Sequence, residues 1–184
     1  MIIGITGTDG AGKGAAVDRL VRHYSFTHFS SRSVIEAEIA ARGMEVNRGT
    51  MRLVANAMRS EFGNDVLIAR ALVKIREEAV SKAVVESVRT LEEAKTLRAN
   101  GGILLAIDAH PKKRYQRISG RKSKTDNVTF AEFLAHEAIE MNDPDPHGMQ
   151  KAAVMKSADY TIMNNGSMSQ LFAKVADFLQ QYED

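Results

Sequence analysis

The chain begins Met1-Ile-Ile-Gly-Ile-Thr-Gly-Thr-Asp-Gly-Ala-Gly-Lys-Gly14, and this stretch decides the fold. Its isoleucines predict a β-strand, and the strand runs straight into a turn with three glycines and a lysine. An apolar helical pattern follows the turn at once, from Ala15 to Val21. A strand, a G-x-x-x-x-G-K turn and a helix in this order are typical of a loop that binds phosphate groups.

The chemistry of the turn explains this prediction. Gly7, Gly10 and Gly12 have no Cβ, so the backbone can adopt positive φ angles and close around an anion. Backbone N–H groups and the start of the next helix then face the phosphates, and Lys13 adds a positive charge. We therefore expect ATP to bind here. The expected contacts are Gly7, Asp9, Gly10, Ala11, Gly12, Lys13, Gly14 and Ala15.

One position departs from the common phosphate-binding pattern, in which a serine or threonine hydroxyl after the lysine contacts Mg²⁺. Gly14 stands there and offers no hydroxyl. Because Mg²⁺ often keeps several waters, it can rest on nucleotide oxygens without a direct protein ligand. We expect Asp9, Glu86 and Asp108 to be the carboxylates that can contact Mg²⁺ through water.

Composition restricts the class of protein. At 184 residues and 44% hydrophobic content, the chain is long enough for one domain with a sizeable core. A net charge of +2 gives no support for binding to nucleic acid or a membrane, and no stretch resembles a signal peptide or a membrane span. Cysteine is absent, which is compatible with a reducing cytoplasm. We expect a cytoplasmic protein whose partner is a small-molecule nucleotide; composition leaves the oligomeric state open.

Strand and helix patterns alternate along the chain, which predicts an α/β fold with a parallel sheet between helices on both faces. The five expected strands are 1–6, 26–29, 83–86, 103–108 and 160–163. Helices are expected to about residue 24, over 33–79 with breaks near 42–43 and 63–64, over 90–100, from 111, and over about 130–141 and 167–182. The fold expected from this order is a three-layer sandwich of the P-loop NTPase type.

A long helical stretch separates the second and third strands. It covers roughly 45 residues, more than a simple crossover needs, and so predicts an inserted helical flap. We expect a single domain over 1–184, with its core at 1–30 and 80–184, the insert at about 31–79, and a short lid at about 121–128.

Polar residues at the ends of the second and third strands form a second candidate set, since ligands of such sheets bind at the carboxyl ends of strands. Arg89 suits a second phosphate, although it could equally be a solvated loop arginine. Glu86 could bind a water on Mg²⁺, pair with Arg89, or form a purely structural ion pair. Ser30 and Arg32 could contact a substrate phosphate or sugar, or the serines here could only cap the next helix.

A basic segment follows the fourth strand. Its members are Lys112, Lys113, Arg114, Arg117, Arg121, Lys122 and Lys124. Arg114, Arg117 and Arg121 recur at helical spacing and so share a face. A basic loop closing over phosphates would neutralise charge and exclude water. A solvated basic face or an RNA-binding patch is the alternative, with Tyr115 the only aromatic residue in the segment.

Together these stretches resemble the nucleoside monophosphate kinases, especially adenylate kinase and the small archaeal-type kinases. The resemblance rests on Gly10-Ala-Gly-Lys-Gly14, His28-Phe-Ser-Ser31, Val85-Glu-Ser-Val-Arg89, Arg117-Ile-Ser-Gly-Arg121 and Asn164-Asn-Gly166. It implies transfer of the γ-phosphoryl group of ATP to a nucleoside monophosphate, AMP-type acceptors being favoured, with Mg²⁺.

The resemblance also implies residue roles. Arg89 would hold the acceptor phosphate, Arg117 would lie beside the donor base with Asn165, and Arg121 would contact the donor phosphates. Lys13, Arg89 and Arg121 are thus the expected catalytic residues.

Three departures from the family pattern keep other functions open. Ala15 and Glu36 replace a threonine and an arginine of adenylate kinase, and no arginine follows Arg121. Lys124 and Lys151 are the candidates to replace the missing arginines. The alternatives are a dephospho-coenzyme A kinase-like enzyme, a nucleotide-binding regulator or weak ATPase, and an RNA-associated protein.

Overall fold

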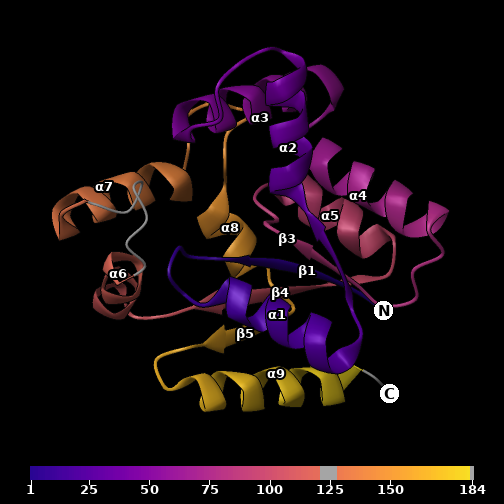
Figure 1. The fold of residues 1–184 in the computed structure, drawn as a ribbon, viewed down its shortest axis with the longest axis vertical. Helices are drawn as coiled ribbons and strands as arrows, with labels where there is room; N and C mark the ends of the chain where they lie inside the picture. Colours follow the sequence, from indigo (N-terminus) through magenta and orange to yellow (C-terminus); the bar gives the residue numbers. More distant parts are fainter. Residues whose placement is uncertain (121–127, 183–184) are drawn as a thin grey trace.

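A parallel sheet between two layers of helices forms the centre of the protein, as seen in a computed structural model that describes residues 1–120 and 128–182 (Figure 1). Its strands are β1 (Ile2–Gly7), β2 (Thr27–Ser30), β3 (Ala83–Glu86), β4 (Gly102–Asp108) and β5 (Tyr160–Met163). They lie in the order β2-β3-β1-β4-β5, and every neighbouring pair is parallel. The predicted α/β class and five-stranded parallel sheet are confirmed.

The helices of the described residues also follow the predicted order. They are α1 (Lys13–Tyr24), α2 (Ser31–Ala41), α3 (Arg48–Phe62), α4 (Val66–Glu77), α5 (Leu91–Ala99), α6 (Pro111–Ser119), α7 (Phe130–Met141), α8 (Lys151–Lys156) and α9 (Met168–Tyr182). The predicted breaks between α2, α3 and α4 are confirmed. The short helix α8 was not predicted, because six residues carry too little periodicity to stand out.

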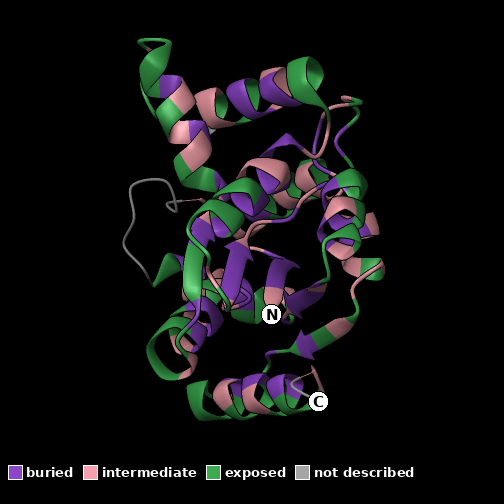
Figure 2. Ribbon diagram, turned by 90° about the vertical axis from the view of Figure 1, so that its right-hand side faces the viewer, coloured by how far each residue is buried: buried purple, intermediate pink, exposed green. Residues whose placement is uncertain are grey.

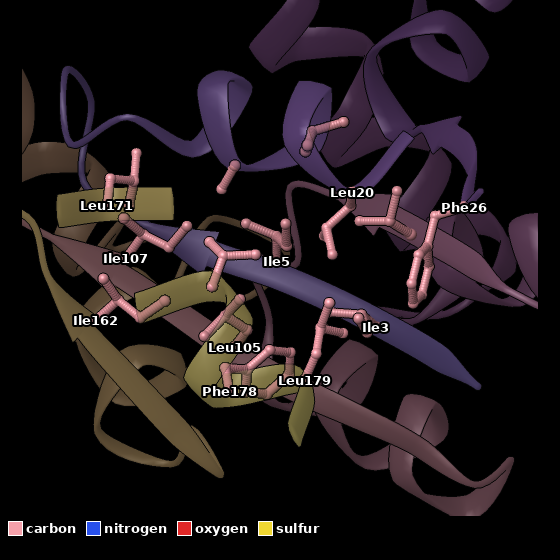
Figure 3. Packing of buried hydrophobic residues seen from close by; sticks show 14 of the residues in the cluster. Ile3, Ile5, Leu20, Phe26, Leu105, Ile107, Ile162, Leu171, Phe178 and Leu179 are labelled. Atoms are coloured by element: carbon pink, nitrogen blue, oxygen red, sulfur yellow. The ribbon is translucent and has the colours of Figure 1, made fainter. Parts of the chain in front are cut away.

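The two faces of the sheet bury different side chains of the same strands, as expected for strands that alternate their side chains. Ile3 and Ile5 of β1 pack with Leu20 of α1 and Phe178 of α9 on one face (Figure 3). On the other face, Leu104 of β4 packs against α4, α5 and α8. The burial pattern follows these layers, with buried residues on the sheet and on the inner sides of the helices (Figure 2). The central strands are therefore held rigidly from both sides.

Helices α2 and α3, with the first turn of α4, form a hydrophobic cluster separate from those on the sheet. It contains Ile35, Ile39, Val54, Ala55, Met58, Val66 and Leu67. Helices α2 and α3 stand away from the sheet at one end of the molecule (Figure 1). Their role as an acceptor-binding insert stays a prediction. The predicted lid lies outside the described residues at positions 121–127.

A segment between α7 and α8 ties this helical region to the sheet. The chain rises from α7 toward α3 and returns to α8 (Figure 1). Arg52 of α3 makes a two-point ion pair with the buried carboxylate of Asp143, at 2.9 Å (Nε–Oδ2) and 2.8 Å (Nη2–Oδ1). Asn56 donates to Asp145 at 2.8 Å, and His147 Nδ1 lies 2.9 Å from Asn64 Oδ1. These contacts fix where α8 begins. Among the described residues, no helix has the length and apolar character to cross a membrane.

Candidate active site

The glycine-rich turn wraps around the ammonium group of Lys13. Lys13 Nζ donates to the carbonyl oxygens of Gly7 at 3.1 Å and Thr8 at 2.8 Å, at the first residue of α1. Gly7 and Gly12 have φ angles of 132° and 104°, which side chains rarely tolerate. A Cβ on Gly7 would lie 2.0 Å from the carbonyl oxygen of Ile107. The glycines are thus required both by conformation and by the close approach of β4.

A polar pocket opens where β1 and β3 end. Its lining is Thr6, Gly7, Asp9, Lys13, Ser87, Val88, Arg89 and Lys151. The lining brings Lys13 together with Arg89, as the sequence predicted, although the two residues belong to different strand–helix turns. The lining contains three cationic side chains and the carboxylate of Asp9, a composition suited to phosphate groups.

Charges in the pocket shift the protonation of its members. Burial and the neighbouring cations lower the pKa of Lys13 to about 8, against the pull of Asp9 in the other direction. Burial alone would raise the pKa of Asp9, but Lys151, Lys13 and Arg89 outweigh it and hold that pKa well below its usual range. Asp9 is therefore a carboxylate throughout the physiological range, whereas Lys13 titrates just above it.

Arg89 is positioned by its backbone rather than by its side chain. Its N–H donates to Glu93 Oε2 at 2.5 Å, and its carbonyl accepts from Gln150 N at 2.8 Å. Glu93 is itself buried beside Arg59 at 3.5 Å, and burial raises the pKa of this carboxyl. Within residues 1–120 and 128–182 the Arg89 guanidinium has no hydrogen bond or ion pair with the protein. It is free to bind an anion in the pocket.

The other residues predicted for the acceptor lie beside the pocket rather than in its lining. Glu86 pairs with His28 at 3.3 Å and not with Arg89, and this contact leads the causes that lower the pKa of Glu86. Arg32 pairs with Glu36 at 2.6 Å on the first turn of α2 and is largely exposed. Ser30 is the N-cap residue of α2, and its side chain makes no capping hydrogen bond.

Helix α6 and the end of β5 clamp the outer side of the glycine-rich turn. Arg117 donates to the carbonyls of Gly10 at 3.3 Å and Asn164 at 2.9 Å. Arg114 is buried, donates to Ala109 O at 2.7 Å and pairs with Glu137. The alternative of a solvated basic face is therefore excluded for Arg114, and its guanidinium is engaged with Glu137. Arg121, Lys122 and Lys124 lie outside the described residues.

The two asparagines after β5 have different roles. Asn164 is buried, and its Nδ2 donates to Ala11 O at 2.7 Å, which fixes the turn from below. Asn165, the predicted donor-base contact, is exposed and accepts from His110 N at 2.7 Å. The sequence placed Asn164 at the end of a strand but did not assign it this contact, because two adjacent polar residues after a strand give no sign of which one faces inward.

The carboxylates named for Mg²⁺ already have protein partners, and their contact with the ion stays a prediction. Among the described residues, no group of three or more His, Cys, Asp or Glu side chains is arranged to hold a metal ion. Asp108 Oδ1 already accepts from Thr8 Oγ1 at 2.5 Å and Ala109 N at 2.7 Å. The hydroxyl of Thr8, which lies in the turn, is therefore already hydrogen-bonded to Asp108. A Cβ on Gly14 would meet no atom within 4 Å, so its lack of a hydroxyl is not a steric requirement.

Comparison with known proteins identifies the domain. A family model described as an AAA domain, AAA_17, matches residues 6–133, from the end of β1 into α7. The chain belongs to this family. The whole chain is also similar to UPF0200 proteins from two organisms. That of Methanocaldococcus jannaschii is 27% identical, the match covering 98% of this chain and 90% of the relative. That of Thermococcus sibiricus is 29% identical, over 95% and 92% of the two chains.

Solved structures share the fold of this chain. A shikimate kinase from Bacteroides thetaiotaomicron superposes with a TM-score of 0.62 at 15% identity, over 98% of both chains. A sugar kinase from a Janibacter species gives 0.55 at 15% identity, over 97% of this chain and 94% of the other. At such identities the likeness shows the fold, that of P-loop kinases.

Proposed function

We propose that this protein transfers the γ-phosphoryl group of ATP to a nucleoside or deoxynucleoside monophosphate, with AMP-type acceptors favoured. The observation that carries the proposal is the guanidinium of Arg89, which is without a protein partner in the described part of the chain and lines the same pocket as Lys13. One cation suits the donor phosphates and the other suits the phosphate of the acceptor.

The chemistry of phosphoryl transfer fits such a pocket. The protein has little covalent work to do, and catalysis comes from holding donor and acceptor in line and neutralising the transferring oxygens. Lys13 lies at the start of α1, where the helix N-terminus also favours phosphate. An acceptor that is itself a phosphate needs no general base, since its oxygen is already ionised.

The remaining site residues belong to the same proposal. Arg121 is the third catalytic residue, and Arg117 with Asn165 borders the donor base. Ser30, Arg32 and Glu86 lie at the start of α2 and the end of β3, where they can contact the acceptor sugar or phosphate. ATP would enter with Mg²⁺, held by nucleotide oxygens and by waters that Asp9, Glu86 or Asp108 can accept from. We place the reaction in the cytoplasm.

An acceptor screen tests the proposal. Purified protein with ATP and Mg²⁺ is offered each common ribo- and deoxyribonucleoside monophosphate in a coupled assay that detects ADP. Diphosphate formation from at least one of them, fastest with AMP or dAMP, is the expected result. Absence of transfer to every monophosphate would overturn the proposal.

A second candidate is phosphorylation of a hydroxyl group, as in a dephospho-coenzyme A kinase-like enzyme. Two ionised carboxylates, Asp9 and Glu86, lie at the ends of β1 and β3, and a hydroxyl acceptor requires such a base. Including dephospho-coenzyme A, shikimate and simple sugars in the same screen separates the candidates. Slow ATP hydrolysis with no acceptor would instead favour a weak ATPase or nucleotide-binding regulator.

A further inference from the structure

A second buried lysine, one of the two candidates for the place of the missing arginines, lines the phosphate pocket. Lys151 is the first residue of α8, and its side chain is only 4% exposed. It belongs to the lining of the same pocket as Lys13 and Arg89. Helix α8 packs beneath the sheet through Val154, which anchors the backbone of Lys151 firmly.

Lys151 shares a carboxylate with Lys13. Its Nζ lies 3.4 Å from Asp9 Oδ1, and Lys13 Nζ lies 3.5 Å from the same oxygen. A second carboxylate, Glu140 at the end of α7, holds Lys151 more closely at 2.7 Å. Glu140 alone is enough to neutralise a structural lysine. The longer contact to Asp9, which is 39% exposed, therefore points to an interaction that a stronger anion can displace.

One further group in the pocket lacks a partner. Thr6 Oγ1 is buried and makes no hydrogen bond in the part of the chain that the structure describes, although Thr6 lines the pocket. A buried hydroxyl without a partner is costly, so a ligand oxygen is its natural complement. Thr6, Lys13, Arg89 and Lys151 thus each offer a donor to one space, beside the carboxylate of Asp9.

We infer that Lys151 is a catalytic residue whose ammonium group contacts the phosphoryl group during transfer. In the free protein Asp9 holds Lys151; when ATP binds with Mg²⁺, the phosphate oxygens replace Asp9 at Lys151. During the reaction the bond between the γ-phosphorus and the β–γ bridging oxygen breaks, and its electron pair stays on ADP. A bond from the acceptor phosphate oxygen to phosphorus forms, with no proton to remove.

The inference rests on the proposed function and adds to it a cation from α8. Lys151 also connects the pocket to the helical insert, because the segment before it is fixed to α3 by Arg52 and Asp143. Glu140 is the positioning residue, since it orients the ammonium group without reaching the pocket lining. The charge of a phosphoryl group in this pocket would be neutralised by three cations, Lys13, Arg89 and Lys151.

The test compares Lys151→Met and Lys151→Gln with Lys151→Arg, using Lys156→Met as the matched control. Lys156 lies on the same helix but is exposed. We expect the Met and Gln variants to lose about 10²-fold in kcat with little change in acceptor KM, as removal of one donor to a transition-state oxyanion typically does. Lys151→Arg should recover part of the loss, and Lys156→Met should retain wild-type rates. Gln can still hydrogen-bond Glu140, so it guards against misfolding of the Met variant.

A binding measurement separates this inference from the proposed function. Calorimetry with ATP and ADP gives the ratio of the two affinities. We expect this preference for ATP to fall about tenfold in Lys151→Gln, because one charge-assisted contact is lost. Unchanged kcat and unchanged preference in both neutral variants would overturn the inference and leave the kinase proposal intact. If the wild type transfers to no monophosphate, the proposed function fails. The change in ATP-to-ADP preference between the wild type and Lys151→Gln then decides by itself whether Lys151 contacts the terminal phosphate.

Discussion

The proposed donor side and the proposed acceptor side of the pocket are built in opposite ways. On the donor side, Arg117 and Asn164 hold the glycine-rich turn by hydrogen bonds to its own carbonyls. On the acceptor side, Arg89 is held only through its backbone, and its guanidinium is without a protein partner in the described part of the chain. The helices beyond it pack in a hydrophobic cluster of their own.

This difference shows where the protein can vary its chemistry. Under the proposed function, the donor side is preorganised for phosphate groups, which every nucleoside triphosphate has in common. The proposed acceptor side has a guanidinium without a hydrogen bond or ion pair in the described residues and a helical region tied to the core by polar contacts, so we expect the choice of acceptor to be made there. The experiments below break the donor side, then the acceptor side, and then measure finer differences between them.

The largest effect is expected from Gly7→Ala. Its Cβ would lie 2.0 Å from Ile107 O at a φ of 132°, so the turn cannot form without moving β4. Strain and overpacking together should lower the free energy of unfolding by about 3 kcal/mol and abolish ATP binding. Thermal unfolding and calorimetry measure both. Gly14→Ala is the matched control, because it meets no atom within 4 Å and should keep both properties.

Lys13→Met should affect catalysis more than any other single change of a cation. We expect a loss of about 10²- to 10³-fold in kcat, because the charge nearest the transferring group disappears. Steady-state kinetics measure this loss, and a melting curve checks that the fold is kept. An unchanged kcat would place the donor phosphates elsewhere in the molecule.

Arg89→Ala should separate the two sides of the pocket. Loss of one charged hydrogen-bonding partner should raise acceptor KM by about 10- to 100-fold while ATP affinity stays near that of the wild type. Initial rates over both substrates give the two constants separately. If ATP affinity and acceptor KM worsen equally, Arg89 belongs to the donor side and the division proposed here is wrong.

The pH dependence of ATP affinity tests the state of Lys13. Its pKa of about 8 in the free protein means that Lys13 is charged below pH 8 and loses its proton above it. Bound phosphates favour the charged form, so binding takes up a proton above pH 8 and affinity should fall there, by about tenfold per unit at most. Calorimetry from pH 7 to 9.5 measures the change. Lys13→Met should bind weakly and without this slope.

The smallest effect is expected from Gly14→Ser, which restores the hydroxyl that most phosphate-binding turns carry. The open space around Gly14 should accommodate it, with no loss of stability. We expect the Mg²⁺ concentration for half-maximal activity to fall a few-fold, since the ion gains a protein ligand. A magnesium titration of the wild type and the variant gives the comparison. A higher Mg²⁺ concentration for half-maximal activity in Gly14→Ser would mean that the ion does not approach the first turn of α1.

The predictable parts of the molecule are those whose signals are local. The glycine-rich turn, strands 83–86 and 160–163 and the helix over 130–141 lie where the periodicity and turn residues placed them. Glycine spacing and apolar alternation depend only on neighbours in sequence, so they survive without knowledge of the rest of the chain.

The parts that sequence could not predict depend on contacts between distant segments. Asn164 faces inward and Asn165 outward because the end of β5 runs beside the glycine-rich turn. The sequence placed Arg114 on a basic face expected to close over phosphates, yet Glu137 of α7 lies beside it and neutralises it in the interior. Glu86 is paired with His28 because β2 and β3 are neighbours in the sheet.

By itself, the sequence determined that this protein has a phosphate-binding turn on a parallel α/β sheet, because backbone conformation and strand formation are encoded locally. Only the tertiary structure decided how the cations of the pocket are arranged around one carboxylate. Lys13, Arg89 and Lys151 come from three separate helix or strand ends, and the sheet order brings them together. Asp9 is four residues from Lys13 along the chain, but only the fold brings Lys151 to the same carboxylate, because electrostatic attraction depends on distance in space.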